Sequence, residues 1–368
     1  MTNIRKTIYE QKEFIYMKRR KKKTFICIIS LSLLALLGAY GLISYQNHHT
    51  PFQEGFVYEL VESTNQSIMK LLGKDYVLNS EAAMLKRKNY ELVTSYNQPV
   101  NDEGIAVDML DNPYFNQKIK GYDYPEPKEI SYHSTVTDTD RHAYVLLPVN
   151  YSTDKMYPVL YLMHGLGGSH RTWLNKDADI ILYNLQYFYN AKEMIVVLPN
   201  NNVNASENTD DFYIGDKIKI YDKIEQDLVQ CLMPYINEHY STLTDKNNTA
   251  IAGNSMGGRE TINIAFHHQD LFGHVGLFSS SYAVKSRKYA GIMRPLFNDL
   301  DVAAEHGGFK TLMLMVGRSD NVCGEWTYYY HDRLTANNVP HIFYTTEGGH
   351  QNKVWQNALY NFGLKIFK

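Results

Sequence analysis

One pentapeptide combines a serine with flanking glycines at the spacing of a nucleophile turn. Gly253-Asn254-Ser255-Met256-Gly257 is the one Gly-x-Ser-x-Gly sequence in the 368-residue chain. An apolar run typical of a buried strand, Thr249 to Ala252, precedes it, and helical apolar spacing from Gly258 to His268 follows it. A sharp strand-to-helix turn needs glycines on both sides of the serine, because side chains there would collide with the neighbouring strand and helix. We therefore predict that Ser255 is a nucleophile at a helix N-terminus.

A serine nucleophile needs a base, and the base needs a carboxylate that orients it. Around such a turn the chain order is Ser, then acid, then His, each at the carboxyl end of a strand. The strand-like run from His341 to Thr345 leads into Gly348-Gly349-His350, and the run from Thr311 to Val316 leads into Asp320. We predict that His350 is the base and Asp320 the orienting acid.

Two other carboxylates remain rivals for the acid. Asp332 falls within a predicted helix, and Glu347 is too close to His350 along the same loop to approach its ring easily. The other histidines fit the role of base less well. His331 and His341 fall within a predicted helix and strand, and His267-His268 ends a helix, where a surface cation suits the helix dipole.

A glycine-rich segment, His164-Gly165-Leu166-Gly167-Gly168, follows the strand-like run Tyr157 to Met163. Glycines there let a backbone N–H point at a developing oxyanion, with the N–H of the residue after the nucleophile as its partner. We therefore predict Leu166 and Met256 as the two donors. The segment lacks the rest of a phosphate-loop or dinucleotide fingerprint, and the chain has no His-Glu-x-x-His, no cysteine pair at ligand spacing and no calcium loop. No metal and no cofactor are predicted.

The elements that would carry these residues alternate between strands and helices. Expected strands cover Ile130–Val136 and His142–Leu147 as a hairpin, then Tyr157–Met163, Met194–Leu198, Thr249–Gly253, Val275–Phe278, Thr311–Val316 and His341–Thr345. Expected helices cover Ala178–Asn190, Tyr221–Tyr240, Gly257–His268, Thr327–Ala336 and Lys353–Phe367. Strands without polar alternation, separated by helices, predict an α/β domain over 121–368, with a mostly parallel sheet covered by helices on both faces.

The first 45 residues read as a cytoplasmic basic segment and a membrane anchor or signal. Six basic residues, Lys18 to Lys23, precede 22 mostly apolar residues, 24–45, which as a helix would reach about 33 Å and cross a bilayer core. The basic flank predicts that the rest of the chain faces outward. We favour a retained anchor, although Ala39-Tyr40-Gly41 offers a cleavage site and translation could begin at Met17.

The body of the chain is acidic. Residues 1–23 carry nine Lys or Arg against two Glu, which leaves 28 basic and 37 acidic residues in 24–368. Because nucleic-acid affinity comes mainly from phosphate neutralisation, this excludes a nucleic-acid-binding protein. Residues 46–120 are expected to be a stalk or small helical preface. Cys231 and Cys323 could pair, but the favoured interpretation is two small buried apolar residues.

From about Gly121 to Phe367 the chain resembles the esterase D / feruloyl esterase family of α/β-hydrolases. The resemblance rests on five motifs in order: Tyr157–Gly165, Ile195–Asn200, Glu225–Leu228, Ala252–Gly258 and Gly348–His350. It implies an α/β-hydrolase fold and acyl-ester chemistry, with Ser255, His350 and Asp320 as the triad. Two positions depart from the family pattern. Asn254 stands where the family usually has an apolar residue, and Gln351 stands where an Asp often follows the histidine; either difference could alter the pocket.

The resemblance and the outward location together predict an exported, membrane-anchored serine carboxylesterase. Its expected substrates are feruloyl or acetyl esters on plant cell-wall polysaccharides, with Trp173 as an aromatic contact or else as an ordinary core residue. A siderophore esterase is the alternative substrate class. An acyltransferase with the same triad and a non-catalytic binding protein on the same fold are the alternatives from other classes. No oligomeric state is predicted.

Overall fold

The computed structural model describes residues 104–106, 112, 114–210, 214–281 and 308–368. They belong to a compact unit that spans Tyr96–Lys368. The predicted membrane segment 24–45 and most of the predicted preface 46–120 lie outside the described residues. Within the described ranges, no helix has the length and apolar character needed to cross a bilayer.

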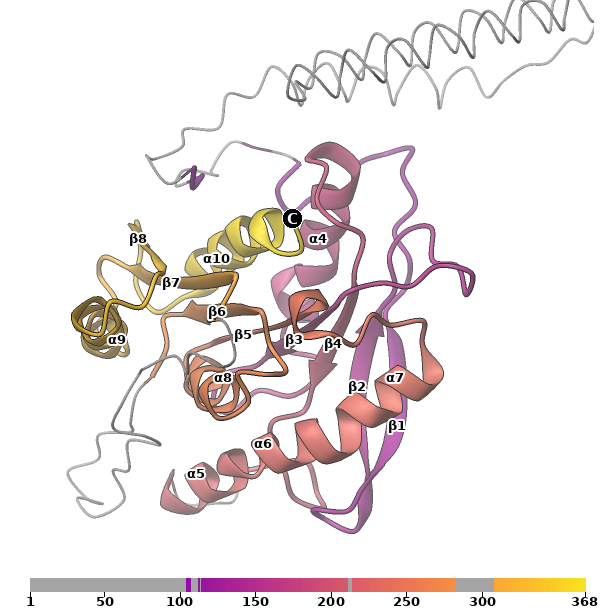
Figure 1. The fold of residues 1–368 in the computed structure, drawn as a ribbon, viewed down its shortest axis with the longest axis horizontal. Helices are drawn as coiled ribbons and strands as arrows, with labels where there is room; N and C mark the ends of the chain where they lie inside the picture. Colours follow the sequence, from indigo (N-terminus) through magenta and orange to yellow (C-terminus); the bar gives the residue numbers. More distant parts are fainter. Residues whose placement is uncertain (1–103, 107–111, 113, 211–213, 282–307) are drawn as a thin grey trace, which may run out of the picture. The chain divides into compact units, whose positions relative to one another are not determined.

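A single eight-stranded sheet forms the centre of this unit (Figure 1). Its strands are β1 (Lys128–Ser134), β2 (Thr139–Leu146), β3 (Val159–Met163), β4 (Ile195–Pro199), β5 (Thr249–Asn254), β6 (His274–Phe278), β7 (Thr311–Gly317) and β8 (Ile342–Thr346). The spatial order is β1-β2-β4-β3-β5-β6-β7-β8. The β1–β2 and β2–β4 pairs are antiparallel and all others are parallel, which confirms the expected hairpin and the mostly parallel sheet.

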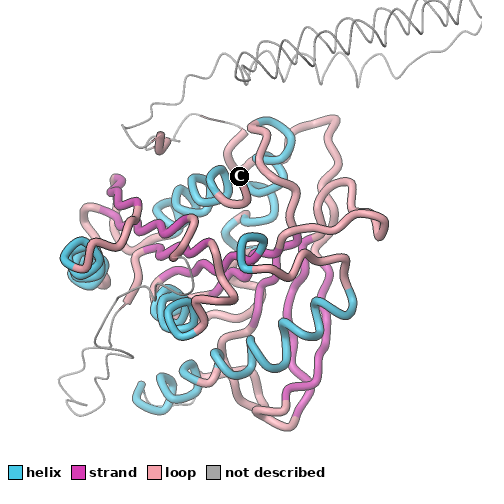
Figure 2. The backbone as a smooth tube through the Cα atoms, in the orientation of Figure 1, coloured by secondary structure: helices cyan, strands magenta, loops and turns pink. Residues whose placement is uncertain are grey.

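Helices cover both faces of the sheet, as predicted (Figures 1 and 2). They are α4 (Ala178–Phe188), α5 (Ile214–Asp222), α6 (Ile224–Asp227), α7 (Met233–His239), α8 (Met256–His267), α9 (Gly324–Ala336) and α10 (Asn352–Lys365), with short turns η1 (Leu174–Lys176), η2 (Leu228–Leu232) and η3 (Lys246–Asn248). One apolar cluster joins α4 and α10 to one face, and a second joins α6, α7, α8 and α9 to the other.

Strand β3 shows why the sheet is buried on both sides. All five of its side chains are buried. Leu160 and Leu162 belong to the cluster on the α4 and α10 side, whereas Tyr161 and Met163 belong to the cluster on the α8 side. Because successive side chains of a strand point to opposite faces, a continuous apolar run produces this double burial.

The single helix expected over 221–240 is wrong, because three helices and a π-helical turn occupy this region. Helix α5 ends at Asp222 and α6 at Asp227, and the π turn η2 precedes α7. Pro234 lies in the first turn of α7 and has no backbone N–H to donate to the preceding turn. A π turn just before the proline is compatible with that missing hydrogen bond.

The compact unit begins before Gly121, where we expected the esterase domain to start. Ile105 and Phe115 lie in the core cluster next to α10 and α4. The Ala106 N–H donates to Asn361 Oδ1 on α10 at 2.9 Å, and Asn116 Nδ2 donates to Asp177 Oδ2 at 3.0 Å. These described residues therefore pack as part of the same body as the sheet.

Candidate active site

Ser255 lies at the turn between β5 and α8, in a backbone conformation that serine rarely adopts. Its φ is 56° and its ψ is −118°. Such a conformation costs about 1–3 kcal/mol and persists only where the surroundings hold it. Here the Ser255 N–H donates to Phe278 O at 3.0 Å, and the Ser255 carbonyl accepts from Ser281 N at 3.0 Å. The β6 strand and the loop after it therefore fix the turn that presents the serine.

The glycines around Ser255 are required by close contacts between backbones. A Cβ at Gly253 would lie 2.6 Å from the carbonyl of Gly257, and a Cβ at Gly257 would lie 2.5 Å from the carbonyl oxygens of Met163 and His164. Backbone atoms cannot move aside as the end of a flexible side chain can. The Gly-x-Ser-x-Gly pattern thus allows β3, β5 and α8 to meet directly beneath the serine.

Three side chains from separate loops form a continuous hydrogen-bonded chain. The Ser255 Oγ lies 2.9 Å from His350 Nε2, and the His350 Nδ1 lies 2.9 Å from Asp320 Oδ2. Because the Asp320 carboxylate can only accept, the His350 Nδ1 carries the proton and its Nε2 is free to accept from the serine hydroxyl. This is the arrangement of a nucleophile, a base and an orienting acid.

Asp320 is held ionised by its hydrogen bonds. Burial alone would raise the pKa of this carboxyl, but hydrogen bonds from His350 and from the N–H groups of Cys323 and Val322 outweigh it and lower the pKa to about 2. The two N–H groups donate to Oδ1 at 2.8 and 2.9 Å. One carboxylate oxygen is thus fixed by the backbone while the other faces the imidazole.

The rival carboxylates lie elsewhere. Asp332 is exposed on α9. Glu347 forms an ion pair with Arg318 at 2.8 Å, and its side chain is 84% exposed. Neither is bonded to His350, so the structure brings Asp320, and not these two, to the histidine.

The loop that carries His350 is locked to the turn that carries Asp320. The Ser319 N–H donates to Gly348 O at 2.9 Å, and a Cβ at Gly317 would lie 2.4 Å from that same oxygen. Gly348 has a φ of 112°, a conformation that L side chains rarely adopt. The loops after β7 and β8 therefore approach so closely that only glycine fits at these positions.

The segment after β3 forms a tight turn against the serine. The Gly168 N–H donates to Gly165 O at 3.1 Å, and Gly167 has a φ of 74°, which is typical of the third position of a type II turn. A Cβ at Gly165 would lie 3.3 Å from the Ser255 Cβ. The next residue is Leu166, whose N–H has no acceptor within such a turn. The Met256 N–H begins α8, where a helix likewise offers no acceptor.

His164 fixes this turn from beneath as a neutral imidazole. Its Nδ1 donates to Gly165 O at 2.8 Å, and its Nε2 accepts from the Asn201 N–H at 2.9 Å. Burial lowers the pKa of His164 to about 4. The ring is therefore uncharged at neutral pH, and Asn200 Oδ1 lies 3.4 Å from the same Nε2.

Two residues that touch the triad were missed by the sequence analysis in this role. The Cys323 Sγ lies 3.9 Å from the Ser255 Oγ, and the Trp355 ring packs edge-on against the His350 ring at 4.9 Å. Cys231 and Cys323 are both buried and free, which confirms the favoured interpretation. The position of Cys323, three residues after the acid, was the available signal for its contact with the site.

Trp173 is a core residue, so its prediction as a substrate contact is wrong. It is 1% exposed, its Nε1–H donates to Met163 O at 2.9 Å, and its ring packs against Phe278 at 6.2 Å. The indole N–H satisfies a carbonyl at the end of β3, and this holds the ring beneath the sheet edge instead of in a cleft. A single sequence cannot distinguish such a buried aromatic residue from one that lines a pocket.

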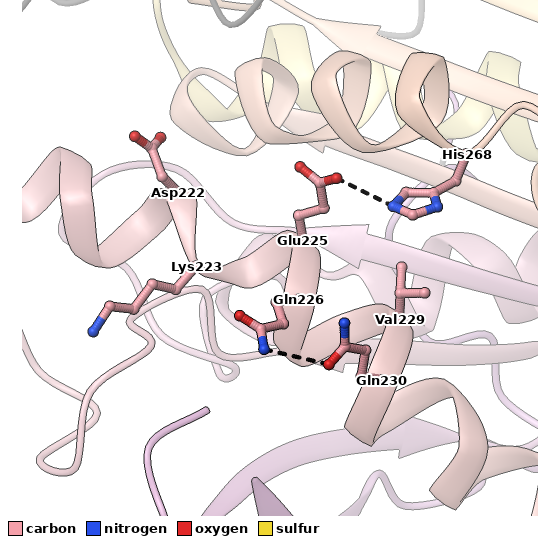
Figure 3. Close-up of a pocket in the computed structure, with 7 residues that line it drawn as sticks. All are labelled: Asp222, Lys223, Glu225, Gln226, Val229, Gln230 and His268. Carbon is pink, nitrogen blue, oxygen red and sulfur yellow. Dashed lines mark hydrogen bonds and ion pairs between the residues drawn. The ribbon is translucent and has the colours of Figure 1, made fainter. Parts of the chain in front are cut away.

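A hollow of about 440 Å³ lies beside α6 (Figure 3). Six of its seven lining residues are polar or charged: Asp222, Lys223, Glu225, Gln226, Gln230 and His268, with Val229 as the apolar one. His268 and Glu225 are bonded across it at 3.1 Å. None of the triad side chains lines it. Among the described residues, no group of three or more His, Cys, Asp or Glu side chains is arranged to hold a metal ion.

With this geometry established, comparison with known proteins identifies the family. The model of the family described as "Putative esterase" matches residues 134–364. The endo-1,4-beta-xylanase/feruloyl esterase of Xylanibacter ruminicola is 32% identical over 185 residues, which are 48% of this chain and 24% of that protein. The chain therefore spans about a quarter of the length of this curated relative.

Solved structures of feruloyl esterases are similar to this chain as well. A CE1 ferulic acid esterase from Anaeromyces mucronatus without substrate is 34% identical, with a TM-score of 0.62 over 72% of this chain and 97% of that one. The same esterase in complex with ferulic acid is 31% identical, with a TM-score of 0.60 over the same shares. The feruloyl esterase module of Clostridium thermocellum, at 17% identity and a TM-score of 0.53 over 74% and 96%, shares the fold. The chain thus belongs to the Esterase family and is a feruloyl esterase-like α/β-hydrolase.

Proposed function

We propose that this protein is a serine carboxylesterase that cleaves feruloyl esters. The observation that carries the proposal is the hydrogen-bonded chain from Ser255 through His350 to Asp320, at 2.9 Å for each step. The oriented imidazole has a free Nε2 in contact with the nucleophile, which is the requirement for general-base catalysis.

In the acylation step, Ser255 Oγ attacks the ester carbonyl carbon while His350 Nε2 takes the hydroxyl proton. The carbonyl π electrons move onto oxygen, and the resulting oxyanion accepts hydrogen bonds from the Leu166 and Met256 N–H groups. Collapse of this intermediate breaks the bond to the alcohol, which leaves with the proton from His350. Asp320 stays ionised and stabilises the imidazolium meanwhile, which is consistent with its pKa of about 2.

Deacylation repeats these steps with water. His350 removes a proton from a water molecule that attacks the acyl-serine carbonyl, and the proton then returns to Ser255 Oγ as the acid is released. Each half-reaction uses the same two oxyanion donors. No group beyond these residues and water is needed to balance the reaction.

The feruloyl group is favoured over an acetyl group by the similarity to feruloyl esterases. Two of the relatives at above 30% identity are a ferulic acid esterase and a xylanase/feruloyl esterase, and the solved relative is matched over 97% of its length. We propose that the natural esters are feruloyl groups on plant cell-wall polysaccharides.

A panel of esters tests this substrate class. The full chain should hydrolyse methyl ferulate with a kcat/KM at least tenfold above that for methyl acetate, and should release ferulate from feruloylated arabinoxylan. Ser255→Ala, purified in the same way, controls for contaminating esterases. Higher activity on acetylated xylan, or on a catecholate siderophore ester, would reassign the substrate. Absence of turnover on every ester would refute the esterase function.

We further propose that residues 24–45 anchor the enzyme in a membrane with the catalytic unit outside. The support is the block Lys18 to Lys23 before 22 mostly apolar residues. Protease added to intact cells should digest the chain beyond residue 46 and spare about the first 20 residues. Protection of the catalytic unit until lysis would overturn the orientation.

A further inference from the structure

Tyr221, near the end of α5, contacts the turn that presents Leu166. The Gly167 N–H donates to Tyr221 Oη at 3.0 Å, and the Tyr221 hydroxyl donates to Gly165 O at 3.3 Å. Its ring packs edge-on against His164 at 5.9 Å, and the residue is fully buried. One hydroxyl group therefore bonds to the residues on both sides of Leu166.

Helix α5 also contacts the second expected donor. Ile218 and Tyr221 form a separate apolar cluster with Met256, whose side chain is 2% exposed. Met256 is the first residue of α8, so its side chain and its N–H belong to the turn that carries Ser255. Helix α5 thus contacts both the turn that carries Leu166 and the side chain of Met256.

The end of α5 is tied to α8 by an ion pair. Asp222, the residue after Tyr221, accepts from Arg259 Nη1 at 2.7 Å, and the Arg259 side chain is only 3% exposed. Arg259 lies in the first turn of α8, four residues after Ser255, and its N–H donates to Ser255 O at 3.2 Å. Asp222 lies where α5 gives way to α6, at one end of the hollow in Figure 3. The contact fixes Tyr221 relative to the nucleophile turn.

We propose that Tyr221 is a positioning residue for the oxyanion hole, and this inference rests on the proposed esterase function. Its hydroxyl engages the Gly165 carbonyl and the Gly167 N–H, which fixes the peptide plane that carries the Leu166 N–H. A misdirected donor weakens binding of the oxyanion more than binding of the neutral ester. Loss of the hydroxyl should therefore reduce kcat and leave KM nearly unchanged.

Tyr221→Phe tests this, because it removes both hydrogen bonds and keeps the ring. We expect kcat for methyl ferulate to fall by about 10- to 100-fold, less than the 10²–10³ typical of deleting a donor outright, with KM within about threefold. Affinity for phenylboronic acid, which forms a tetrahedral adduct with the serine, should fall in proportion to kcat. The pH dependence of kcat should not move, because the triad is untouched.

Tyr183→Phe is the matched control. Tyr183 is also a buried tyrosine, 1% exposed, but its hydroxyl donates to Leu147 O at 3.2 Å, away from the turn. It should keep kcat and boronate affinity within twofold of the wild type. If Tyr221→Phe also keeps both within twofold, the inference is overturned. An equal loss in the two variants would overturn it as well, because the effect would then be general to buried tyrosines.

Asp222→Asn provides a second route should Tyr221→Phe fail to fold. It weakens the contact of α5 with Arg259 and leaves the Tyr221 hydroxyl in place, so kcat and boronate affinity should both fall by about three- to tenfold. Unchanged values would overturn the inference. A wild-type protein without turnover on any ester would instead refute the proposed function, which keeps the two failures distinct.

Discussion

The two halves of the site are held in different ways. Asp320 and His350 are fixed by hydrogen bonds between their own side chains and by loops in close backbone contact. The proposed oxyanion donors are backbone N–H groups. The Leu166 N–H lies in a turn whose carbonyl and N–H groups bond to His164 and Tyr221, whereas the Met256 N–H lies at the start of α8.

The two kinds of catalytic group also differ in how well a sequence reveals them. A side chain that performs chemistry must be of a particular type, so its identity can be recognised in a sequence. A backbone donor can belong to any residue other than proline, and what matters is the conformation around it. The proposed oxyanion donors are therefore positioned only by groups outside the reacting set, whereas Asp320 and His350 also bond directly to each other.

The largest expected effect is that of removing the nucleophile. Ser255→Ala should lower turnover of methyl ferulate by about 10⁴-fold or more, because a triad without its nucleophile retains only the oxyanion hole and binding. The melting temperature should stay within about 2 °C of the wild type, since little packing is lost. Ser206→Ala, at an exposed loop position, should be unaffected. Near-normal turnover in Ser255→Ala would show that Ser255 is not the nucleophile, and the roles assigned to the acid–base residues and to the oxyanion donors would then both be wrong.

The acid–base half is tested next by its carboxylate. Asp320→Asn should lower turnover by about 10⁴-fold, because an amide favours the wrong tautomer of His350. Asp332→Asn, on the exposed face of α9, should change it by less than about tenfold. Both variants should be compared by kcat on methyl ferulate and by melting temperature. A dead Asp332→Asn beside an active Asp320→Asn would contradict the geometry of the triad.

The oxyanion half is tested by deleting one N–H. Leu166→Pro removes the donor at the second position of a type II turn, where proline is well tolerated. We expect a 10²–10³-fold fall in kcat with a modest change in KM, by analogy with loss of one oxyanion donor. Leu166→Ala keeps the N–H and should remain within about threefold on a small ester. Equal losses in the two variants would assign the role to the leucine side chain and not to the backbone.

The smallest expected effect is on stability in acid and involves His164. Burial lowers the pKa of His164 to about 4 from an ordinary value of 6.5. Between these values the unfolded chain binds a proton that the folded protein excludes, so stability falls as the pH falls. The loss from His164 alone should be about 3 kcal/mol between pH 7 and pH 4.

Urea denaturation at several pH values measures this effect. His164→Asn, which keeps a donor for Gly165 O, should start less stable than the wild type at pH 7, and the gap should shrink toward pH 4. His274, whose pKa burial also lowers to about 4, titrates in the same window in both proteins and cancels. Parallel losses in wild type and variant would contradict the assignment. Asp320, with its pKa lowered to about 2, should lose its contribution only as the pH falls further, through about 2.

Features that depend on local sterics and on side-chain type could be predicted from the order of the residues alone. Glycines around Ser255 marked a turn where a Cβ would strike backbone, and apolar runs such as Val159–Met163 marked strands buried on both faces. Ser255, Asp320 and His350 each follow a predicted strand, and the carboxyl ends of parallel strands meet at one edge of a sheet. Their side chains lie in hydrogen-bonding contact in the structure.

Features that depend on contacts between distant segments became visible only in the folded chain. Folding placed Trp173 in the core, brought Cys323 to the serine, and divided the segment expected as one helix into α5, η2 and their neighbours. Tyr221 bonds to a turn 54 residues earlier in the chain, and no local pattern reports such a contact. Burial and hydrogen-bond partners are properties of the packed chain, because the same residue types serve equally well in a core, on a surface or beside a site.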